Sequence, residues 1–444
     1  MRVSIVGTGY VGLVSGVCLA HVGHDVTCID VDQSKVDKIN RGEPPIYEVG
    51  LEDLLKKLVG DKLSATTDFD RAVRNSDLSL IAVGTPFDGQ EIDLQYIRQV
   101  ARQIGEVLKT KDSYHTVIVK STVVPGTTED VVLPILEEAS GKKAGTDFGV
   151  GMNPEFLKEG EAIDDFMYPD RIVLGGIDEK SIDALAELYA AFPDTDKIRT
   201  SPRTAEMIKY TANSLLATLI SFSNEIGNLC TAIGGVDVTE VMEGVHLDKR
   251  FSPILDQGRV RPSSLTYIEA GAGFGGSCFP KDVKALITYG QDKAQPMSVL
   301  KSVIETNKAQ PSRMVEMAKR HYPSLGGVKV AVLGLAFKPG TDDIRESASL
   351  TVIDQLQAEG AVIIAFDPIA QEETEKHLGP DAAIAYADTV AAAIDGAEVV
   401  MLMTSWPEFH DLPRMLEGRD ALLIDGRRMI PKGAVPRYEG IGLS

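Results

Sequence analysis

A glycine-rich segment places one cysteine where a nucleophile would be useful. Residues 271–282 read Gly-Ala-Gly-Phe-Gly-Gly-Ser-Cys-Phe-Pro-Lys-Asp. Because proline favours the first turn of a helix, Pro280 predicts that Cys278 lies just ahead of a helix N-terminus. The positive end of the helix dipole lowers the pKa of such a thiol and favours the thiolate. We also expect the glycines to keep side chains away from the approach to the thiol.

The two residues after Pro280 carry opposite charges. Lys281 adds a cation near the thiol, and Asp282 lies four residues past Cys278, in the first turn of the expected helix. The simpler interpretation of this segment is a glycine-rich turn with a buried cysteine. The remaining motifs of the chain favour the catalytic interpretation.

Two further pairs of polar residues have a spacing of four. Lys209 and Asn213 share one face of a predicted helix, although an isolated pair of this kind is most often solvated. A lysine there can stabilise a developing oxyanion, and an asparagine can hydrogen-bond a hydroxyl group. Glu155 and Glu159 follow Pro154, and their simpler interpretation is the acidic first turn of a helix.

The start of the chain has the pattern of a dinucleotide-binding unit. Residues 2–6 form an apolar strand, which leads into Gly7-Thr8-Gly9-Tyr10-Val11-Gly12, a helical pattern to about His21 and a strand at residues 25–30. The glycines would let the backbone approach a pyrophosphate at the helix N-terminus. Asp30 would accept hydrogen bonds from a ribose and repel a 2′-phosphate, which favours NAD over NADP. The alternative is a glycine turn in a flavodoxin-like sheet.

Later strands end in small polar residues that suit a ligand site. We expect strands at residues 78–83 and 116–119, and these lead into Gly84-Thr85-Pro86 and Lys120-Ser121-Thr122. In a parallel sheet, ligands bind beyond the carboxyl ends of the strands, so both segments are candidate ligand contacts. Further strands are expected near residues 148–151 and 172–175.

The length of 444 residues predicts two or three domains. Residues 205–233 have helical periodicity, which predicts a long helix that connects domains and dimerises two chains, or alternatively a buried core helix. A second α/β pattern has strands at residues 328–333, 362–366, 398–403 and 421–424. We therefore predict an α/β protein with two doubly wound Rossmann-like domains, residues 1–200 and 312–444, and a central all-helical domain, residues 201–311. The second pattern lacks the GxGxxG loop, which suggests a different nucleotide or a scaffold.

Composition argues against several classes of function. A formal net charge of −20 is unsuited to a nucleic-acid partner, and no apolar run is long enough to span a membrane. The first strand begins without a signal-peptide pattern, and the four cysteines have no paired or metal-like spacing. We expect a reduced, cytoplasmic protein without a metal. An anionic ligand would need a local group of lysines and arginines.

Residues 273–282, Gly-Phe-Gly-Gly-Ser-Cys-Phe-Pro-Lys-Asp, resemble the signature of the UDP-glucose/GDP-mannose dehydrogenase family, and matching motifs recur to about residue 430. The resemblance implies a four-electron reaction in which NAD oxidises the C6 alcohol of a nucleotide sugar to a uronic acid. Cys278 would add to the aldehyde, and the thiohemiacetal would be oxidised to a thioester that water hydrolyses. Lys209 would stabilise oxyanions, and Asp282, with a water held by Thr122, would serve as base.

The same resemblance assigns further residues to ligands. Glu155 would manage protons or water at the reacting end of the sugar, and Asn213 would face the nicotinamide with Lys209; whether Glu155 or Asp282 handles hydrolysis stays open. The implied cofactor contacts are Gly7, Gly9, Tyr10, Val11, Gly12, Asp30, Lys35, Thr85, Thr122, Glu159, Lys281 and Arg345. The other implied substrate contacts are Phe156, Leu157, Lys158, Tyr267, Ile268, Glu269, Ala270, Gly271, Gly275, Lys338 and Arg427.

The substrate within the family is a separate question. Residues 169–172 and 425–427 resemble the UDP-glucose branch, whereas residues 141–155 resemble the GDP-mannose branch. In the family, an arginine in the segment before residue 271 reaches the nucleotide of a neighbouring subunit. This segment is longer here than in the usual UDP-glucose form. We choose Arg250 for this role, and Arg259 and Arg261 are the alternatives. We predict UDP-glucose, with GDP-mannose or a UDP-N-acetylhexosamine as alternatives.

Two other classes of function stay open. The pair of Lys209 and Asn213 also resembles hydroxyacid dehydrogenases of the 6-phosphogluconate type, which carry out a two-electron oxidation. A non-catalytic NAD-binding protein with a redox-sensing thiol would have the same glycine loop and the same cysteine. For the enzyme we expect a small-molecule substrate and a homodimer or higher homo-oligomer.

Overall fold

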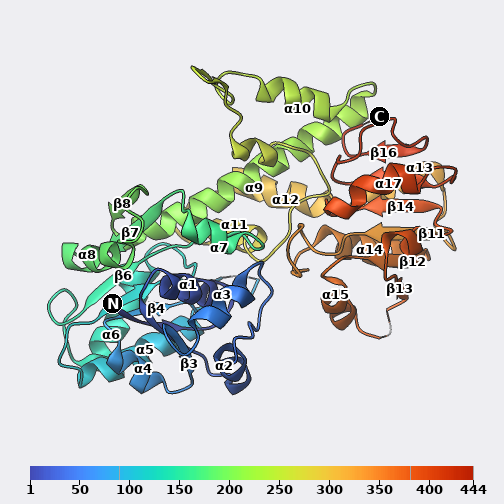
Figure 1. Ribbon diagram of the computed structural model, residues 1–444. Helices are drawn as coiled ribbons and strands as arrows, with labels where there is room; N and C mark the ends of the chain where they lie inside the picture. Colours follow the sequence, from blue (N-terminus) through green and yellow to red (C-terminus); the bar gives the residue numbers. More distant parts are fainter. Residues whose placement is uncertain (90, 381, 444) are drawn as a thin grey trace. The chain divides into compact units, whose positions relative to one another are not determined.

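The computed structural model describes residues 1–89, 91–380 and 382–443. The chain forms two compact units, Met1–Ala212 and Asn213–Ser444. The boundary between them falls inside α9 (Pro202–Ile233), the long helix drawn in green in Figure 1. The sequence predicted this helix from residue 205, and it starts three residues earlier, at a proline. Proline is tolerated there because the N–H groups of the first turn have no acceptor within the helix, so the N–H that proline lacks costs no hydrogen bond.

The first unit is built around a sheet that has eight strands among the described residues. Its order is β3-β2-β1-β4-β5-β6-β7-β8, and neighbouring strands are parallel except β6 and β7. The order reverses between β1 and β4, and open parallel sheets bind ligands at such a reversal. The strands are Arg2–Val6 (β1), Asp25–Ile29 (β2), Leu63–Thr66 (β3), Leu78–Ile81 (β4), Thr116–Val119 (β5), Gly149–Met152 (β6), Ile172–Gly176 (β7) and Lys197–Thr200 (β8).

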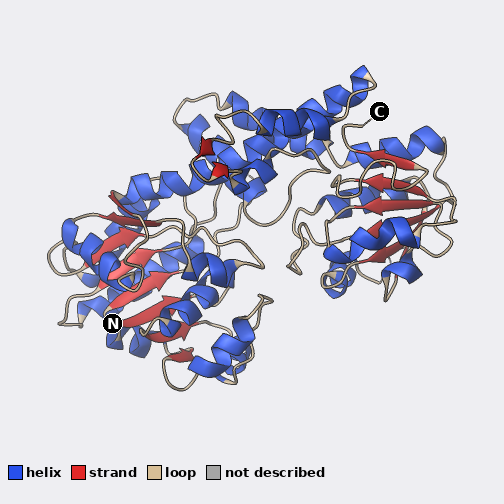
Figure 2. Cartoon of the chain, turned by 45° about the horizontal axis from the view of Figure 1, so that its top comes forward, coloured by secondary structure: helices blue, strands red, loops and turns tan. Residues whose placement is uncertain are grey.

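Helices cover both faces of this sheet (Figure 2). Side chains alternate between the faces of a strand, so Val3 and Ile5 of β1 belong to one core and Val6 belongs to the other. The helices are Tyr10–His21 (α1), Gln33–Asn40 (α2), Leu51–Leu58 (α3), Phe69–Asn75 (α4), Gln95–Lys109 (α5), the π-helix Thr127–Val132 (η1), Leu133–Ser140 (α6), Ala162–Met167 (α7) and Glu179–Leu188 (α8).

The second unit combines a helical region with a parallel sheet of order β13-β12-β11-β14-β15-β16. The strands of this sheet are Lys329–Leu333 (β11), Val362–Phe366 (β12), Ile384–Tyr386 (β13), Val399–Leu402 (β14), Leu422–Asp425 (β15) and Tyr438–Gly440 (β16). One large core joins the sheet to the helices packed on it. An antiparallel pair in the helical region is formed by Ile254–Leu255 (β9) and Gly258–Arg259 (β10).

The helices of the second unit follow the C-terminal part of α9. They are Val238–His246 (α10), Ser263–Tyr267 (η2), Phe279–Asp292 (α11), Ser298–Ala309 (α12), Ser312–His321 (α13), Ala348–Ala358 (α14), Gln371–Leu378 (α15), Val390–Ala393 (α16), Pro407–Asp411 (η3) and Leu412–Met415 (α17). In the described part of the chain, no helix is long and apolar enough to cross a membrane.

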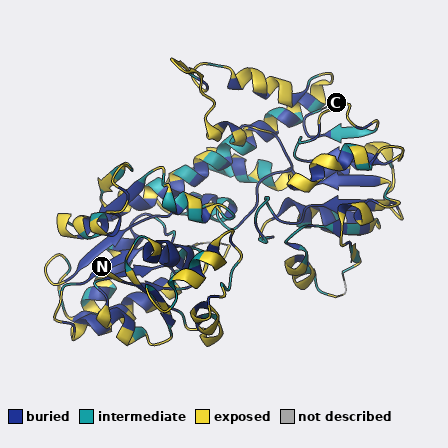
Figure 3. Ribbon diagram, in the orientation of Figure 1, coloured by how far each residue is buried: buried dark blue, intermediate teal, exposed yellow. Residues whose placement is uncertain are grey.

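The predicted fold class is confirmed, since both sheets are of the parallel, Rossmann-like kind and a helical region lies between them in the sequence. Figure 3 shows the reason that the central strands could be predicted: they are buried, and their long apolar runs are typical of strands covered on both faces. The sequence pattern did not predict the short strands β3, β8, β13 and β16. These strands lie at the edges of the two sheets and are partly exposed, so their apolar pattern is weak.

Candidate active site

The loop after β1 has three glycines with three different surroundings. Gly7 has a φ of +99°, and a Cβ there would lie 2.7 Å from the carbonyl oxygen of Ala82. A Cβ on Gly12 would lie 2.0 Å from the Gly7 oxygen, so this glycine allows α1 to pack closely. Gly9 is the N-cap of α1, and a Cβ there would have no heavy atom of the described residues within 4 Å. Gly9 therefore leaves space for a ligand at the helix N-terminus, as a bound pyrophosphate requires.

Asp30 follows β2 beside this loop. Its carboxylate accepts hydrogen bonds from the Thr8 N–H and from the Asp32 N–H, each at 3.0 Å. Burial opposes the charge, but these hydrogen bonds, that of the Thr8 hydroxyl and the nearby Lys35 hold the pKa of Asp30 below its usual value. The side chain is therefore an anion, which suits the recognition of ribose hydroxyls.

Tyr10, next to Gly9, is tied to a residue that the sequence analysis missed. Its hydroxyl donates to the buried carboxylate of Glu48, which also accepts from the backbone N–H groups of Gly160 at 2.7 Å and Ala162 at 2.9 Å. The charge of Glu159 contributes to the raised pKa of Tyr10, after burial and Glu48 itself. Glu159 therefore lies near the N-terminus of α1. Glu48 could not be found from the sequence, because it precedes a short helix without any motif.

The loops after β4 and β5 meet beside the same reversal in strand order. The Thr85 hydroxyl donates to the carbonyl oxygen of Thr122 at 2.8 Å. Ser121 donates to the carbonyl oxygens of Ile81 at 3.2 Å and Val83 at 2.7 Å. The two predicted cofactor contacts, Thr85 and Thr122, are thus held together at the carboxyl edge of the sheet.

Glu155 and Lys209 form a buried ion pair. Glu155 Oε1 lies 2.7 Å from Lys209 Nζ, with 6% and 4% of the two side chains exposed. Burial would raise the pKa of Glu155, but Lys209, the Leu157 N–H and Lys120 together hold it below its usual value. The interpretation as an acidic helical turn is wrong, because residues 153–158 have no regular secondary structure and α7 begins only at Ala162. Glu155 is free of the helix and reaches α9 instead.

Lys120 is a second buried cation that the sequence analysis left without a role. Its ammonium group donates to Asn153 Oδ1 at 2.9 Å and to the Tyr189 hydroxyl at 3.3 Å. Burial lowers its pKa to about 8; the attraction of Glu155 opposes this and the repulsion of Lys209 adds to it. The signal that could have identified it was a lysine directly after the valine- and isoleucine-rich strand β5, which is fully buried.

The segment after Glu155 lines a cavity of the first unit together with Lys120, Arg171 and Tyr189. Phe156 lies there with the Arg171 guanidinium 3.8 Å above its ring. Leu157 is half-buried beside it. Lys158 points to the acidic side of α7, where it pairs with Glu161 and with Asp165, the latter at 3.3 Å.

In the second unit, Cys278 is the N-cap of α11, as Pro280 predicted. Its thiol is partly exposed and lies 3.5 Å from the Ser277 hydroxyl. Asp282 is fully buried in the first turn, and its backbone N–H donates to the Cys278 oxygen at 2.8 Å. Asn213 donates to Asp282 Oδ2 at 2.6 Å, and Lys281 Nζ lies 2.8 Å from Oδ1. A carboxylate, an amide and an ammonium group are thus grouped at the helix that carries the thiol.

The glycines before Cys278 have a different purpose from the one predicted. A Cβ on Gly275 would lie 2.3 Å from the backbone oxygen of Glu346, and a Cβ on Gly276 would lie 2.8 Å from the Phe337 ring. The Gly276 N–H donates to the Arg345 oxygen, and the Ala272 N–H donates to the Gly426 oxygen, each at 2.8 Å. At these positions glycine lets the cysteine loop pack against the C-terminal sheet region. The expectation that all the glycines clear the approach to the thiol is therefore corrected.

Arg427 belongs to the same packing. It donates from Nη1 to the Gly273 oxygen at 3.0 Å and from Nε to the Met403 oxygen at 2.6 Å, and burial lowers its pKa to about 10. The Gly271 N–H donates to Asn224 Oδ1 of α9 at 2.8 Å. The cysteine loop is therefore held from both the helical region and the sheet region.

The remaining predicted contacts of the second unit, including the predicted cofactor contact Arg345, lie in the segment before this loop and in the segment after β11. Tyr267 ends η2 with its ring centroid 6.3 Å from that of Phe279. Ile268 and Ala270 are buried, whereas Glu269 is exposed. Lys338 and Arg345 lie between β11 and α14, where Arg345 Nε donates to Asp343 Oδ1 at 2.8 Å.

The three candidate arginines for the neighbouring subunit have different surroundings. Arg250 has 85% of its side chain exposed and pairs with Asp248. Arg259 donates to the backbone oxygens of Leu247 and Ser252, each at 2.8 Å, and so closes its own loop. Arg261 is exposed.

The glycine loop of the second sheet is built differently from that of the first. After β11 the chain runs to Ala348 before α14 starts, and the Ser349 hydroxyl in the first turn of this helix donates to the Gly334 oxygen at 2.8 Å. The N–H groups of Leu335 and Ala336 donate to Asp367 Oδ2 at 2.7 and 3.1 Å, and the Trp406 indole donates to the same atom at 2.9 Å. This loop lacks the GxGxxG pattern and the helix directly after it that would hold a dinucleotide pyrophosphate in the first unit.

Lys209 and Asn213 lie on successive turns of α9, on either side of the boundary between the units. Each is engaged within its own unit, Lys209 with Glu155 and Asn213 with Asp282. The predicted catalytic residues therefore form two groups, and one helix carries a member of each.

Comparison with known proteins gives a consistent result along the chain. Models of the UDP-glucose/GDP-mannose dehydrogenase family match its NAD binding domain at residues 1–193, its central domain at residues 203–309 and its UDP binding domain at residues 331–432. The chain is 40% identical to a UDP-glucose 6-dehydrogenase of Haloferax volcanii, over 99% of this chain and 100% of the relative. It is 46% identical to a GDP-mannose 6-dehydrogenase of Pseudomonas syringae, over 83% and 81%. A solved UDP-glucose dehydrogenase of Pyrobaculum islandicum is similar with a TM-score of 0.90 and 39% identity, over 100% and 98% of the two chains.

Proposed function

The chain belongs to the UDP-glucose/GDP-mannose dehydrogenase family and is an NAD-dependent nucleotide-sugar 6-dehydrogenase, and we propose that it converts UDP-glucose to UDP-glucuronate through a thioester on Cys278. The observation that carries the proposal is the position of Cys278 at the N-cap of α11, with Asp282 in the first turn. A two-electron alcohol oxidation needs no nucleophile, whereas oxidation to the acid is aided by one that captures the aldehyde.

The proposed reaction balances with two NAD⁺ and one water consumed, and with two NADH and three protons released for each sugar. When bound, NAD supplies the hydride acceptor. The C6 alcohol loses a proton and a hydride, and the Cys278 thiolate then forms a carbon–sulfur bond to the aldehyde. The thiohemiacetal loses a second hydride and becomes a thioester. Addition of water breaks the carbon–sulfur bond and returns the thiolate.

The residues divide this work according to their charge. Lys209 would stabilise the negative oxygen of each tetrahedral intermediate, since its ammonium group is buried and the interior strengthens such interactions. Glu155 is an anion, because its pKa is held low, so it would orient Lys209 or a water rather than donate a proton. Asp282, fixed by Asn213, would be the base of the hydrolytic step, together with a water at Thr122.

The NAD contacts fit the loop that the structure leaves open. Gly7, Gly9 and Gly12 would hold the pyrophosphate at α1, and Asp30 would bind the adenosine ribose with Lys35 nearby. Tyr10, Val11, Thr85 and Thr122 would contact the rest of the cofactor from the first unit, and Glu159, Lys281 and Arg345 would complete the set. Because the loop after β11 lacks these features, both hydride transfers would use this one binding site in turn.

UDP-glucose is the proposed substrate because two segments, residues 169–172 and 425–427, resemble the UDP-glucose branch. Overall identity does not separate the two substrates. A UDP-glucose 6-dehydrogenase is 40% identical over 99% of this chain, and GDP-mannose 6-dehydrogenases are 46% identical over 83% of it or 40% identical over 99%. Residues 312–444 would bind the nucleotide, with Lys338 and the cysteine loop toward the diphosphate and sugar. GDP-mannose is the alternative that the second relative supports.

We further propose that two copies of the chain associate through α9 in the central region, residues 201–311. Leu215, Phe222 and Leu229 recur every seven residues on α9 and have 57%, 53% and 54% of their surface exposed. A repeat of seven places apolar residues on one side of a helix, where a second copy can cover them. Arg250, whose side chain is 85% exposed, would reach the partner's nucleotide. A cytoplasmic location would keep Cys278 reduced.

A substrate panel with NADH stoichiometry tests the proposal. UDP-glucose, GDP-mannose and UDP-N-acetylhexosamines are each incubated with excess NAD, and NADH absorbance is compared with the sugar consumed. Two NADH per UDP-glucose support the proposal. One NADH per sugar would indicate a two-electron hydroxyacid dehydrogenase, and NAD binding without turnover on any sugar would indicate a redox-sensing protein.

The Cys278→Ser variant tests the nucleophile. We expect it to keep NAD affinity within about twofold, because Cys278 lies outside the glycine loop after β1. We expect it to lose uronate formation by about 10³-fold or more. Uronate is measured by chromatography, and NADH fluorescence titration is the control for folding. Undiminished uronate in this variant would refute the thioester.

A further inference from the structure

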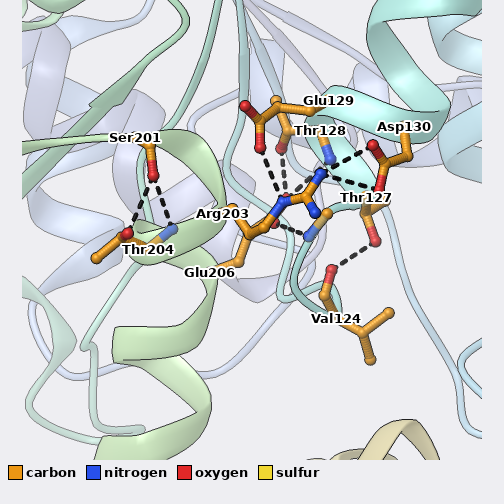
Figure 4. A network of polar contacts seen from close by, with 10 residues as sticks. Val124, Thr127, Thr128, Glu129, Asp130, Ser201, Arg203, Thr204 and Glu206 are labelled. Atoms are coloured by element: carbon orange, nitrogen blue, oxygen red, sulfur yellow. Dashed lines mark hydrogen bonds and ion pairs between the residues drawn. The ribbon is translucent and has the colours of Figure 1, made fainter. Parts of the chain in front are cut away.

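A buried carboxylate outside the residues assigned so far joins two elements of the first unit. Glu206 of α9 is fully buried, and it lies against the start of η1 (Figure 4). The Gly126 N–H donates to its Oε2. Thr128 donates to Oε1 twice, from its backbone N at 2.8 Å and from its Oγ1 at 2.7 Å. Three donors therefore converge on one side chain.

Each of the two joined elements carries a residue of the proposed active site. Thr122 lies four residues before Gly126 in the same loop, and its carbonyl oxygen is held by Thr85. Lys209 lies three residues after Glu206 on α9 and pairs with Glu155. A shift of this loop along α9 would therefore change the distance between Thr122 and Lys209.

We propose that Glu206 is a positioning residue for the oxidation: its ionised carboxylate holds the start of η1 against α9 and so fixes Thr122 relative to Lys209. This inference rests on the proposed function. The alternative is that Glu206 only satisfies N–H groups that the start of any helix leaves unpaired. In that case its loss would lower stability without a kinetic signature.

Glu206 ionises in the range where the enzyme would operate, because burial raises its pKa to about 7 against the opposing hydrogen bonds from Thr128 and Gly126. Charged side chains near it on both elements include those of Glu129, Asp130 and Arg203 (Figure 4). Glu129 raises the pKa further, and Arg203 pairs with Glu129 at 3.1 Å and with Asp130 at 2.8 Å.

A protonated carboxyl group has an O–H of its own and accepts less well from three converging donors. Protonation of Glu206 would therefore loosen the contact between the loop and α9. An acid limb in kcat with an apparent pKa near 7 is the expected signature, since that is the value to which burial brings Glu206.

The central experiment compares the pH dependence of kcat and of the UDP-glucose KM in the wild type and in Glu206→Gln. The glutamine has the same shape, but its NH₂ group would face a backbone donor. Since a misplacement of about 1 Å can cost about 10²-fold in rate, we expect kcat to fall by about 10- to 100-fold with little change in KM. The acid limb near pH 7 should disappear, whereas any limb due to Cys278 would persist.

Two further variants keep the test decisive. Thr128→Val removes one hydrogen bond that lowers the pKa of Glu206, so the acid limb should move to higher pH. Arg203→Met removes the surface ion pairs between the same two elements, and we expect kcat within about threefold of the wild type, because exposed pairs contribute little. If Glu206→Gln does not fold, the shift in Thr128→Val carries the test.

Hydrogen exchange gives a readout independent of turnover. The amides of Gly126 and Thr128 should exchange faster in Glu206→Gln and remain protected in Arg203→Met. An unchanged acid limb in Glu206→Gln would overturn the inference, and so would an equal loss of kcat in Arg203→Met. In both cases the proposed function would stand, provided that the wild type still turns over. A wild type that oxidises no nucleotide sugar would instead defeat the proposed function.

Discussion

At the scale of single residues, the first unit buries two lysines around one carboxylate. Lys209 pairs directly with Glu155, and Lys120 contributes a second positive charge from the end of β5. A buried charge is costly unless it is compensated, and here one anion serves two cations. The charge of Lys120 is the least compensated of the three, because its hydrogen-bond partners are neutral oxygens.

Lys120→Met should reveal this cost as a change in stability with pH. Burial lowers the pKa of Lys120 from 10.5 to about 8, so between these values the unfolded chain holds a proton that the folded chain has lost. The free energy of unfolding of the wild type should therefore rise relative to Lys120→Met as the pH increases through this window, by about 3 kcal/mol at most. Urea denaturation of both proteins across this range measures the difference. Parallel curves would contradict the assignment.

At the scale of elements, two glycine loops have different reasons for their glycines. The loop after β1 keeps Gly9 open to a ligand, whereas the loop before α11 keeps Gly275 free for the backbone of Glu346. Sequence motifs do not separate these two cases, because both read as glycines next to a helix start. The difference depends on which atoms face the absent Cβ.

Gly9→Ala and Gly275→Ala form a matched pair that tests this difference. Gly9 has a φ of −71°, so alanine is tolerated there, and we expect an unchanged melting temperature with NADH affinity reduced by about tenfold or more. Gly275→Ala should destabilise the fold by about 1–3 kcal/mol through overpacking, with NADH affinity preserved. Thermal unfolding and NADH titration are the two measurements. A destabilised Gly9→Ala with normal NADH affinity, or a stable Gly275→Ala with weakened NADH affinity, would contradict this assignment of the two loops.

At the scale of the whole molecule, the chain exposes a stripe of apolar residues on its longest described helix. Leu215, Phe222 and Leu229 lie on the part of α9 that belongs to the second unit. Exposed apolar patches of this kind mark interaction sites in many proteins. The proposed occupant is a second copy, because the same stripe on both chains can form a symmetric interface.

Phe222→Glu should therefore shift the protein from dimer to monomer. A carboxylate in the middle of the stripe would be buried without a partner in the dimer, and this would cost several kcal/mol. Sedimentation velocity measures the change, and Lys301→Glu on α12, which makes the chain more negative by two charges rather than one, is the control that should remain dimeric. A monomeric wild type, or a dimeric Phe222→Glu, would contradict the proposed interface.

The sequence was sufficient for the elements and for local placement. The apolar runs of β1, β5 and β12 predicted these strands, because a strand covered on both faces must be apolar along its length. Pro280 likewise predicted the N-cap position of Cys278, since this depends only on neighbouring residues. The family was also recognisable, because its motifs are contiguous.

Only the tertiary structure decided which partners each side chain has. Three pairs join residues that are 54, 69 and 78 positions apart, and no local pattern encodes such contacts: Glu155 with Lys209, Asn213 with Asp282, and Glu206 with Thr128. The anionic state of Glu155 and the raised pKa of Glu206 follow from burial and from these partners. Local spacing determines which face a residue occupies, whereas charge state and contact depend on the surroundings that folding brings to that face.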